Sequence, residues 1–309
     1  MKWLKRAGYV ALALVAFSIP AYWWLLVESH RASATTFPID IAEVRRLADS
    51  QAGEKPLFIR VETVAHLSAP RTIVVAGDGW QSIDLPVSSY ELVYRDHLVV
   101  LDTALNADIA KSMSATSFDG AAYSRVSSAL ARASLIVVTH EHPDHVGGLL
   151  AQPNLMKLLP ATRLTREQVA VLKDNLQTDP FVVLHLSSRV FTGYRPLGYV
   201  RYKAIAPGVV LIKAPGHTPG SQMVYVRRAD GVEFLFLGDV AWQMRNVDAV
   251  REKARLATWL AGEERSMVRE ELAALSILHA AEPELRMMPG HDAASIDSFV
   301  KKKLFVRGF

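Results

Sequence analysis

The sequence predicts an α/β protein in which two packed β-sheets are flanked by helices, with one membrane-spanning helix in front. Strand-like runs separated by turn residues fill two halves of the chain, and helical stretches accompany each half. A long apolar run precedes the first half. Residues 56–309 contain no linker-like stretch, so we expect them to form a single domain.

The apolar run at residues 7–27 is the expected membrane helix. It has no charged residue over 21 positions, which is enough for a helix to cross a hydrocarbon core of about 30 Å. Residues 1–6 include three basic residues, so we expect this end in the cytoplasm and the body on the periplasmic or extracellular side. The alternative is a signal peptide cleaved after the small residues 32–34, which places the body on the same side.

The remaining elements follow from the spacing of apolar and turn residues. Residues 28–55 are predicted to be a polar tether with one outer helix, within IDIAEVRRLADS. In the first half we predict strands at LFIRVETVAHL, TIVVAG, YELVYRD and HLVVLDT, and a helix at FDGAAYSRVSSALARA. In the second half we predict strands at GVVLIKAPGH and ELRMMPGHD and a hairpin at SQMVYVRRADGVEFLFLGD. A helical stretch at 246–281 is expected to break near Gly262.

Residues 175–200 differ from the rest of the body because they contain many turn residues among aromatic residues. Two interpretations stay open for this segment. It forms either a lid or wall beside a substrate, or an ordinary surface insertion.

Composition excludes several classes of function. The chain has 309 residues, no cysteine and a formal net charge of +4. Seven basic residues lie in the two ends, and the remaining 28 basic residues are outnumbered by 31 acidic ones. The body is therefore slightly acidic, which argues against a nucleic-acid-binding face. The absence of cysteine excludes disulfides, a thiolate nucleophile and Cys-bound zinc.

The segment HEHPDH places four potential metal ligands directly after the apolar run SLIVVT. His140 and His142 are two residues apart, so on an extended segment their side chains point the same way and can hold one metal ion. Asp144 and His145 follow the rigid Pro143 and can face a second position beside the first. Neutral imidazole suits zinc, whereas carboxylate suits harder divalent ions.

This pattern, His-x-His-x-Asp-His after an apolar strand, resembles the metallo-β-lactamase-fold hydrolases, and three later motifs fit the same family. APGHTPGS supplies His217, FLFLGD supplies Asp239, and MMPGHD supplies His291. The resemblance covers residues 58–299 and implies an αββα sandwich of two packed mixed sheets that binds two divalent metal ions, Zn²⁺ foremost. It also implies the ligand sets, which are His140, His142 and His217 for one ion, Asp144, His145 and His291 for the other, and Asp239 as a bridge.

Asp102, at the end of the run LVVLDT, has a further role implied by the resemblance. In the family, an Asp at this place orients a metal-binding His through the second N–H of its imidazole. A turn or helix-capping role is the alternative reading of the same residue.

The resemblance also implies the reaction, in which a metal-bridging hydroxide attacks an ester-like or lactone bond of a small-molecule substrate. Asp144 and Asp239 are the implied catalytic residues: Asp144 handles a proton, and Asp239 sets the spacing of the metals. The lactonases and organophosphate hydrolases of the family share all seven ligands. The lactonases have a Tyr where this chain has Trp242, which we expect either on the substrate side of the metals or packed beneath the loop as part of the core.

Other hydrolases of the family, and one class without turnover, stay as alternatives. They are a phosphodiesterase or nuclease, a thioesterase similar to glyoxalase II, and a metal-binding sensory module. Only 18 residues follow His291, whereas glyoxalase II has a helical glutathione-binding region there. Asp239 argues against a β-lactamase, because β-lactamases of the family lack an Asp at this place. Nucleic acid is not an expected partner.

Overall fold

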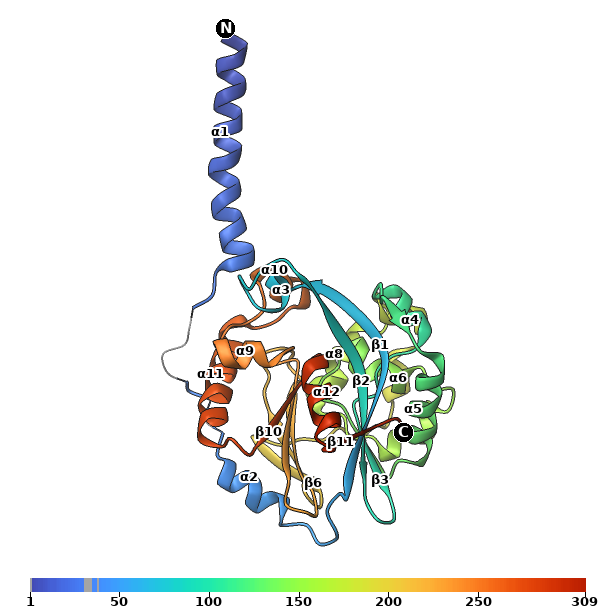
Figure 1. The fold of residues 1–309 in the computed structure, drawn as a ribbon. Helices are drawn as coiled ribbons and strands as arrows, with labels where there is room; N and C mark the ends of the chain where they lie inside the picture. Colours follow the sequence, from blue (N-terminus) through green and yellow to red (C-terminus); the bar gives the residue numbers. More distant parts are fainter. Residues whose placement is uncertain (1, 31–34, 38) are drawn as a thin grey trace.

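The first of two mixed sheets has the strand order β11-β1-β2-β3-β5, with the short β4 beside β1 (Figure 1). Strands β1 and β2 form a long antiparallel pair, whereas β3 pairs with β5, and β1 with β11, in parallel. The strands of this sheet are β1 (Phe58–Pro70), β2 (Ser82–Val93), β3 (Leu98–Leu101), β4 (Ser117–Phe118), β5 (Leu135–Val137) and β11 (Phe305–Arg307).

The second sheet has the order β10-β9-β8-β7-β6, in which only β9 and β10 are parallel. The hairpin predicted between β8 and β9 is present, and Gly231 supplies the positive φ of 86° that its turn requires. The strands are β6 (Tyr202–Ala206), β7 (Val209–Lys213), β8 (Gln222–Arg227), β9 (Glu233–Gly238) and β10 (Arg286–Pro289).

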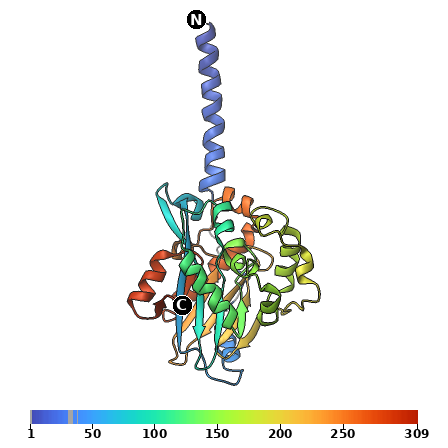
Figure 2. The ribbon, with the colours of Figure 1, turned by 90° about the vertical axis from the view of Figure 1, so that its right-hand side faces the viewer.

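The two sheets pack face to face, and helices cover both outer faces (Figures 1 and 2). The inner core joins apolar residues of both sheets; for example, the rings of Tyr90 and Phe236 lie 4.8 Å apart. The first sheet is covered by α4 (Ala107–Ser112), α5 (Gly120–Arg132), α6 (Pro143–Leu150), α7 (Leu155–Leu158) and α8 (Arg166–Asn175), with the 3₁₀ turns η2 (Leu159–Ala161), η3 (Phe181–Leu184) and η4 (Ser188–Phe191). The second sheet is covered by α2 (Ile41–Ala48), α9 (Met244–Ala249) and α11 (Arg265–Ala281), and α12 (Ala293–Lys301) closes the edge near β10. Helix α10 (Arg255–Ala261) instead packs on α3 (Arg71–Val74). The αββα sandwich predicted from the sequence is confirmed.

Local sequence explains where several helices begin and end. The carboxylate of Asp40 caps α2 by accepting a hydrogen bond from the Glu43 N–H at 3.0 Å. Asp119 caps α5 in the same way. The helical stretch expected at 246–281 breaks at Gly262, which ends α10 with a φ of 69°. It also breaks between Ala249, the end of α9, and Arg255, the start of α10, which the sequence did not predict.

One strand prediction is wrong. Residues of the run TIVVAG form the single helical turn α3 (Arg71–Val74) and the loop after it. Their polar groups bond to a loop and to the N-terminal segment rather than to a strand, since the Thr72 N–H donates to the Gly79 carbonyl and the Gly77 N–H to the Leu26 carbonyl.

The N-terminal helix α1 (Lys2–Tyr22) projects from the body and continues as the π-helix η1 (Trp23–Val27) (Figure 1). The computed structural model describes residues 2–30, 35–37 and 39–309. Within these ranges, no helix has both the length and the apolarity needed to cross a membrane. The transmembrane helix predicted at residues 7–27 is therefore not supported. The apolar run is divided between α1, which also includes the basic residues before it, and η1, which packs on α3 and α10. The cleavage site considered at 32–34 lies outside the described residues.

Candidate metal centre

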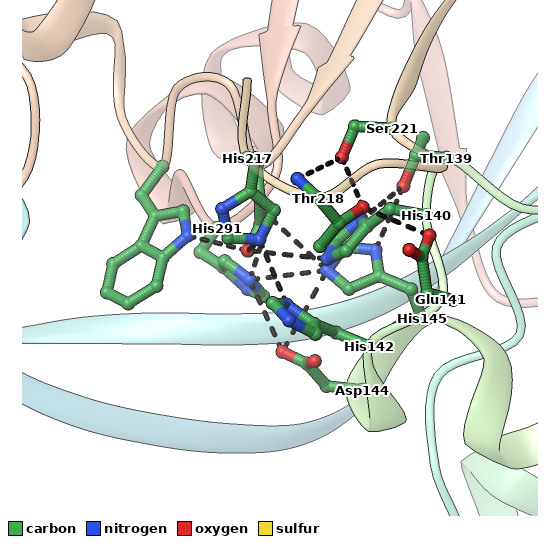
Figure 3. Close-up of polar contacts among 12 residues, drawn as sticks. Thr139, His140, Glu141, His142, Asp144, His145, His217, Thr218, Ser221 and His291 are labelled. Atoms are coloured by element: carbon green, nitrogen blue, oxygen red, sulfur yellow. Dashed lines mark hydrogen bonds and ion pairs between the residues drawn. The ribbon is translucent and has the colours of Figure 1, made fainter. Parts of the chain in front are cut away.

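The seven predicted ligands come together at one edge of the sandwich, beyond the carboxyl ends of four strands. His140 and His142 follow β5, and Asp144 and His145 lie in the first turn of α6, where Pro143 is the first helical residue. The other three follow β7, β9 and β10 in turn, and they are His217, Asp239 and His291. Figure 3 shows the five imidazoles and Asp144 gathered around one centre.

The side chains divide into two groups whose potential ligand atoms lie within 4.8 Å of one another: His140, His142, His217 and Asp239, and Asp144, His145 and His291. In the first group, His217 Nε2 lies 2.9 Å from His142 Nδ1. In the second, His145 Nε2 and His291 Nε2 are 3.4 Å apart. Apart from Asp239, which falls in the first group here, these groups have the same members as the two ligand sets that the family resemblance implied.

Asp239 faces both groups with different oxygens. Its Oδ2 lies 3.4 Å from His217 Nε2 and 3.8 Å from His140 Nε2. Its Oδ1 lies 3.3 Å from His145 Nε2 and 3.2 Å from His291 Nε2. One carboxylate is thus positioned to share its two oxygens between two metal positions.

The chemistry of these residues fits divalent metal ions. Six of the seven residues are buried, and neither His140 Nε2 nor Asp239 Oδ1 has a hydrogen-bond partner in the described part of the chain. Burial lowers the pKa of His142 to about 3 and that of His140 well below its usual range, so both imidazoles are neutral and offer lone pairs. Buried polar atoms normally have a partner, and a cation would supply one here.

Hydrogen bonds from behind fix the orientation of four imidazoles. The Nδ1 atoms are held by Thr139 Oγ1 at 3.1 Å for His140, Asp102 Oδ2 at 3.0 Å for His145, Glu263 Oε2 at 2.7 Å for His217 and the Pro86 carbonyl at 3.0 Å for His291. Each contact leaves Nε2 facing the centre. Asp102 therefore lies where the family resemblance implied, and its Oδ1 also accepts a hydrogen bond from the Thr139 N–H at 2.6 Å.

Two supporting residues, Glu263 and Lys253, were missed by sequence reasoning. The Glu263 carboxylate accepts a hydrogen bond from His217 and lies 2.9 Å from Lys253 Nζ. The ammonium of Lys253 is buried and also donates to the Asp239 carbonyl at 2.7 Å. Although burial opposes ionisation of Glu263, the ammonium of Lys253 and the hydrogen bond from His217 lower the pKa of this carboxylate. No motif surrounds either residue, because Glu263 lies 46 residues from its partner His217 and Lys253 lies 14 residues from its partner Asp239.

A cavity of about 390 Å³ opens onto the centre. Trp242 lines it, as the sequence analysis expected, and also packs against buried residues such as Val74. Its indole N–H donates to Asp239 Oδ2 at 2.6 Å. Asp179 and Pro180 line the same cavity, so one part of the 175–200 segment is a wall of the site.

The first prediction concerns Glu263. Replacing Glu263 with Ala should weaken Zn²⁺ binding by about 10- to 100-fold, the usual effect of removing a residue that orients a metal-binding His. Competition with a chromophoric chelator measures this affinity. Glu264→Ala is the matched control, since the Glu264 side chain is exposed and accepts hydrogen bonds from Ser266. Equal affinities in the two variants would contradict the role assigned to Glu263.

Comparison with known proteins finds one similar family model and several solved structures with a similar fold. Residues 83–155 match the family model of the metallo-beta-lactamase superfamily. A quorum-quenching N-acyl homoserine lactone lactonase has a TM-score of 0.58 at 17% identity, covering 80% of this chain and 97% of its own. A dizinc quorum-quenching lactonase has a TM-score of 0.56 at 14% identity, covering 79% and 90%. A probable metal-dependent hydrolase from Staphylococcus aureus has a TM-score of 0.59 at 11% identity, covering 78% and 91%.

No curated protein matches the sequence. At these identities the solved structures establish the shared fold alone, whereas the family model matches the segment that carries four of the seven ligands. Fold, family model and donor set together support a metal-dependent hydrolase. Residues 83–155 are thus similar to the metallo-β-lactamase superfamily, and the fold of the body agrees with that similarity.

Proposed function

We propose that this protein is a dinuclear metal-dependent hydrolase that cleaves an ester-like or lactone bond of a small molecule. The observation that carries the proposal is the position of Asp239, which presents one oxygen to each of two groups of ligands. The solved lactonases with this fold favour a lactone or ester substrate within the superfamily.

The residues of the two groups would hold two divalent ions, and the imidazole-rich donor set favours Zn²⁺. When bound, such ions activate a water molecule as a nucleophile and polarise the oxygen of the scissile carbonyl. The carboxylate of Asp144 lines the cavity and would accept a proton there. Thr139, Asp102, Glu263 and the Pro86 carbonyl would keep the imidazoles in place throughout.

The cavity lining favours a small, partly apolar substrate over a phosphodiester. Besides the ligands, apolar side chains form most of the wall, among them Leu67, Leu85, Met113 and Trp242. None of the residues that line this cavity, in the part of the chain the structure describes, is Lys or Arg. A polyanionic substrate such as nucleic acid would lack the basic contacts that its phosphates need.

The decisive test combines metal content with turnover. We expect two ions per chain by elemental analysis of the metal-replete protein, and hydrolysis of lactones or activated esters that is lost on chelation and restored by Zn²⁺. A panel of lactones, thioesters, phosphodiesters and β-lactams should identify the bond. One ion or fewer per chain would contradict the dinuclear centre. Faster turnover of phosphodiesters or thioesters would favour those alternatives, and metal binding without turnover of any substrate would favour a sensory module.

A further prediction concerns the indole N–H of Trp242. Trp242→Phe keeps an apolar ring in the wall but removes the donor to Asp239, and hydrogen bonds to charged groups contribute about 1.5–3 kcal/mol. We expect kcat to fall by about 10-fold or more, since 1.36 kcal/mol corresponds to a factor of ten, with little change in KM. Trp259→Phe, on an exposed Trp of α10, is the control. An unchanged kcat with a raised KM would indicate that Trp242 only lines the cavity and that its hydrogen bond to Asp239 does not contribute to turnover.

The location of the body outside the cytoplasm remains a proposal that rests on the sequence, namely on the basic residues 1–6 ahead of the apolar run. Protease added to spheroplasts should then digest the body. Protection until the cells are lysed would place the body in the cytoplasm.

A further inference from the structure

The segment after α1 is built into the body rather than tethered beside it. We call residues 23–30, which comprise η1 and the residues following it, the N-terminal clamp. The Leu26 carbonyl accepts hydrogen bonds from the Gly77 N–H and the Thr72 hydroxyl, both at 2.9 Å. The Trp24 ring lies 4.6 Å from the guanidinium of Arg255. Figure 1 shows the base of α1 beside α3 and α10.

Glu28 is the most deeply buried residue of the clamp, at 4% exposure. Arg255 donates a hydrogen bond to its carboxylate at 2.6 Å, and Arg265 bonds both to its carboxylate and to its carbonyl. Although burial opposes ionisation, these two guanidinium groups lower the pKa of Glu28 to about 2, so the residue is an anion at neutral pH. A buried charge of this kind stabilises the fold only while its partners are in place.

A second contact of the clamp involves Glu252, which lies near the start of residues 251–265. The Ser29 hydroxyl donates to the fully buried carboxylate of Glu252 at 2.8 Å. Glu252 in turn accepts from Arg269 at 2.8 Å and lies 2.7 Å from Arg265. The clamp therefore holds residues 251–265 at both ends through one connected network of charges.

Residues 251–265 also carry two of the groups that support the metal centre from behind. Within them, Lys253 holds the Asp239 carbonyl and Glu263 holds His217. Lys253 directly follows Glu252, and Glu263 lies two residues before Arg265. A displacement of Glu252 would thus move Lys253, which holds the backbone of Asp239. A displacement of Arg265 would move Glu263, which orients the imidazole of His217.

We propose that the N-terminal clamp is an integral part of the metal centre and that Glu28 is a positioning residue, acting through residues 251–265 on His217 and Asp239. The proposal rests on the metal centre proposed above. It also means that a chain beginning at residue 35 would retain every metal ligand but bind metal more weakly.

The test compares two buried glutamates in the full chain. Glu28→Gln removes the charge of the clamp, whereas Glu62→Gln removes a comparable buried charge from β1, where Glu62 pairs with Arg125 at 2.8 Å and accepts from the Phe309 N–H. We expect Glu28→Gln to raise the Kd for Zn²⁺ by about 10-fold, the lower end of the range for residues behind a metal ligand. Glu62→Gln should lower the melting temperature without changing the Kd.

Limited trypsin digestion of the metal-free chain gives a second readout, independent of zinc. Cleavage at residues 251–255 should be faster in Glu28→Gln than in the wild type or in Glu62→Gln, because the clamp no longer restrains this loop. Ser29→Ala, which removes one hydrogen bond, should show the same changes to a smaller degree and is available if Glu28→Gln does not fold.

The outcomes separate the clamp from the proposed function. A wild-type Zn²⁺ affinity in Glu28→Gln, or an equal loss of affinity in Glu28→Gln and Glu62→Gln, would overturn the clamp alone. If the wild-type chain binds no Zn²⁺, the proposed metal centre fails and the role of Glu28 toward it fails as well.

Discussion

The shared carboxylate of Asp239 is the constraint around which the site is built. It must lie within reach of ligands from both halves of the sandwich, so its backbone can move very little. Gly238, directly before it, has a φ of 52°, and a Cβ added at Gly290 would lie 2.3 Å from Asp239 Oδ1. The parallel strands β9 and β10 end side by side, so the loop of His291 lies against Asp239 and leaves no room for a side chain at residue 290.

The seven candidate ligands could be predicted from the sequence because each lies in a short motif that follows an apolar strand, and five of them are next to Gly or Pro. The carboxyl ends of neighbouring strands meet at one edge of the fold, so local patterns translate into a common site. Glu263, Lys253 and Glu28 have no such pattern. Glu263 is 46 residues from His217, and Glu28 is 237 residues from Arg265, so these contacts exist only in the assembled fold.

In the N-terminal region, too, the sequence pattern did not predict the contacts that form in the folded protein. Hydropathy identified residues 7–27 as one apolar run, but apolar character does not say what covers a segment. In the structure η1, the last part of that run, packs on α3 and α10, and the Leu26 carbonyl accepts hydrogen bonds from the Gly77 N–H and the Thr72 hydroxyl. The wrong strand prediction at TIVVAG thus reflects contacts with η1 that no local pattern in the sequence indicates.

Charge balance connects the ligands to their surroundings. Asp102, Asp144 and Asp239 are all buried, and within the described residues their side chains form ion pairs only with histidines. Burial opposes protonation of His145, but the three aspartates outweigh it and raise the pKa of His145, so the imidazole itself supplies positive charge. Divalent cations would take over this compensation and leave the imidazoles neutral. Glu263 differs because Lys253 already neutralises it, so it can hold His217 without adding to the negative charge at the centre.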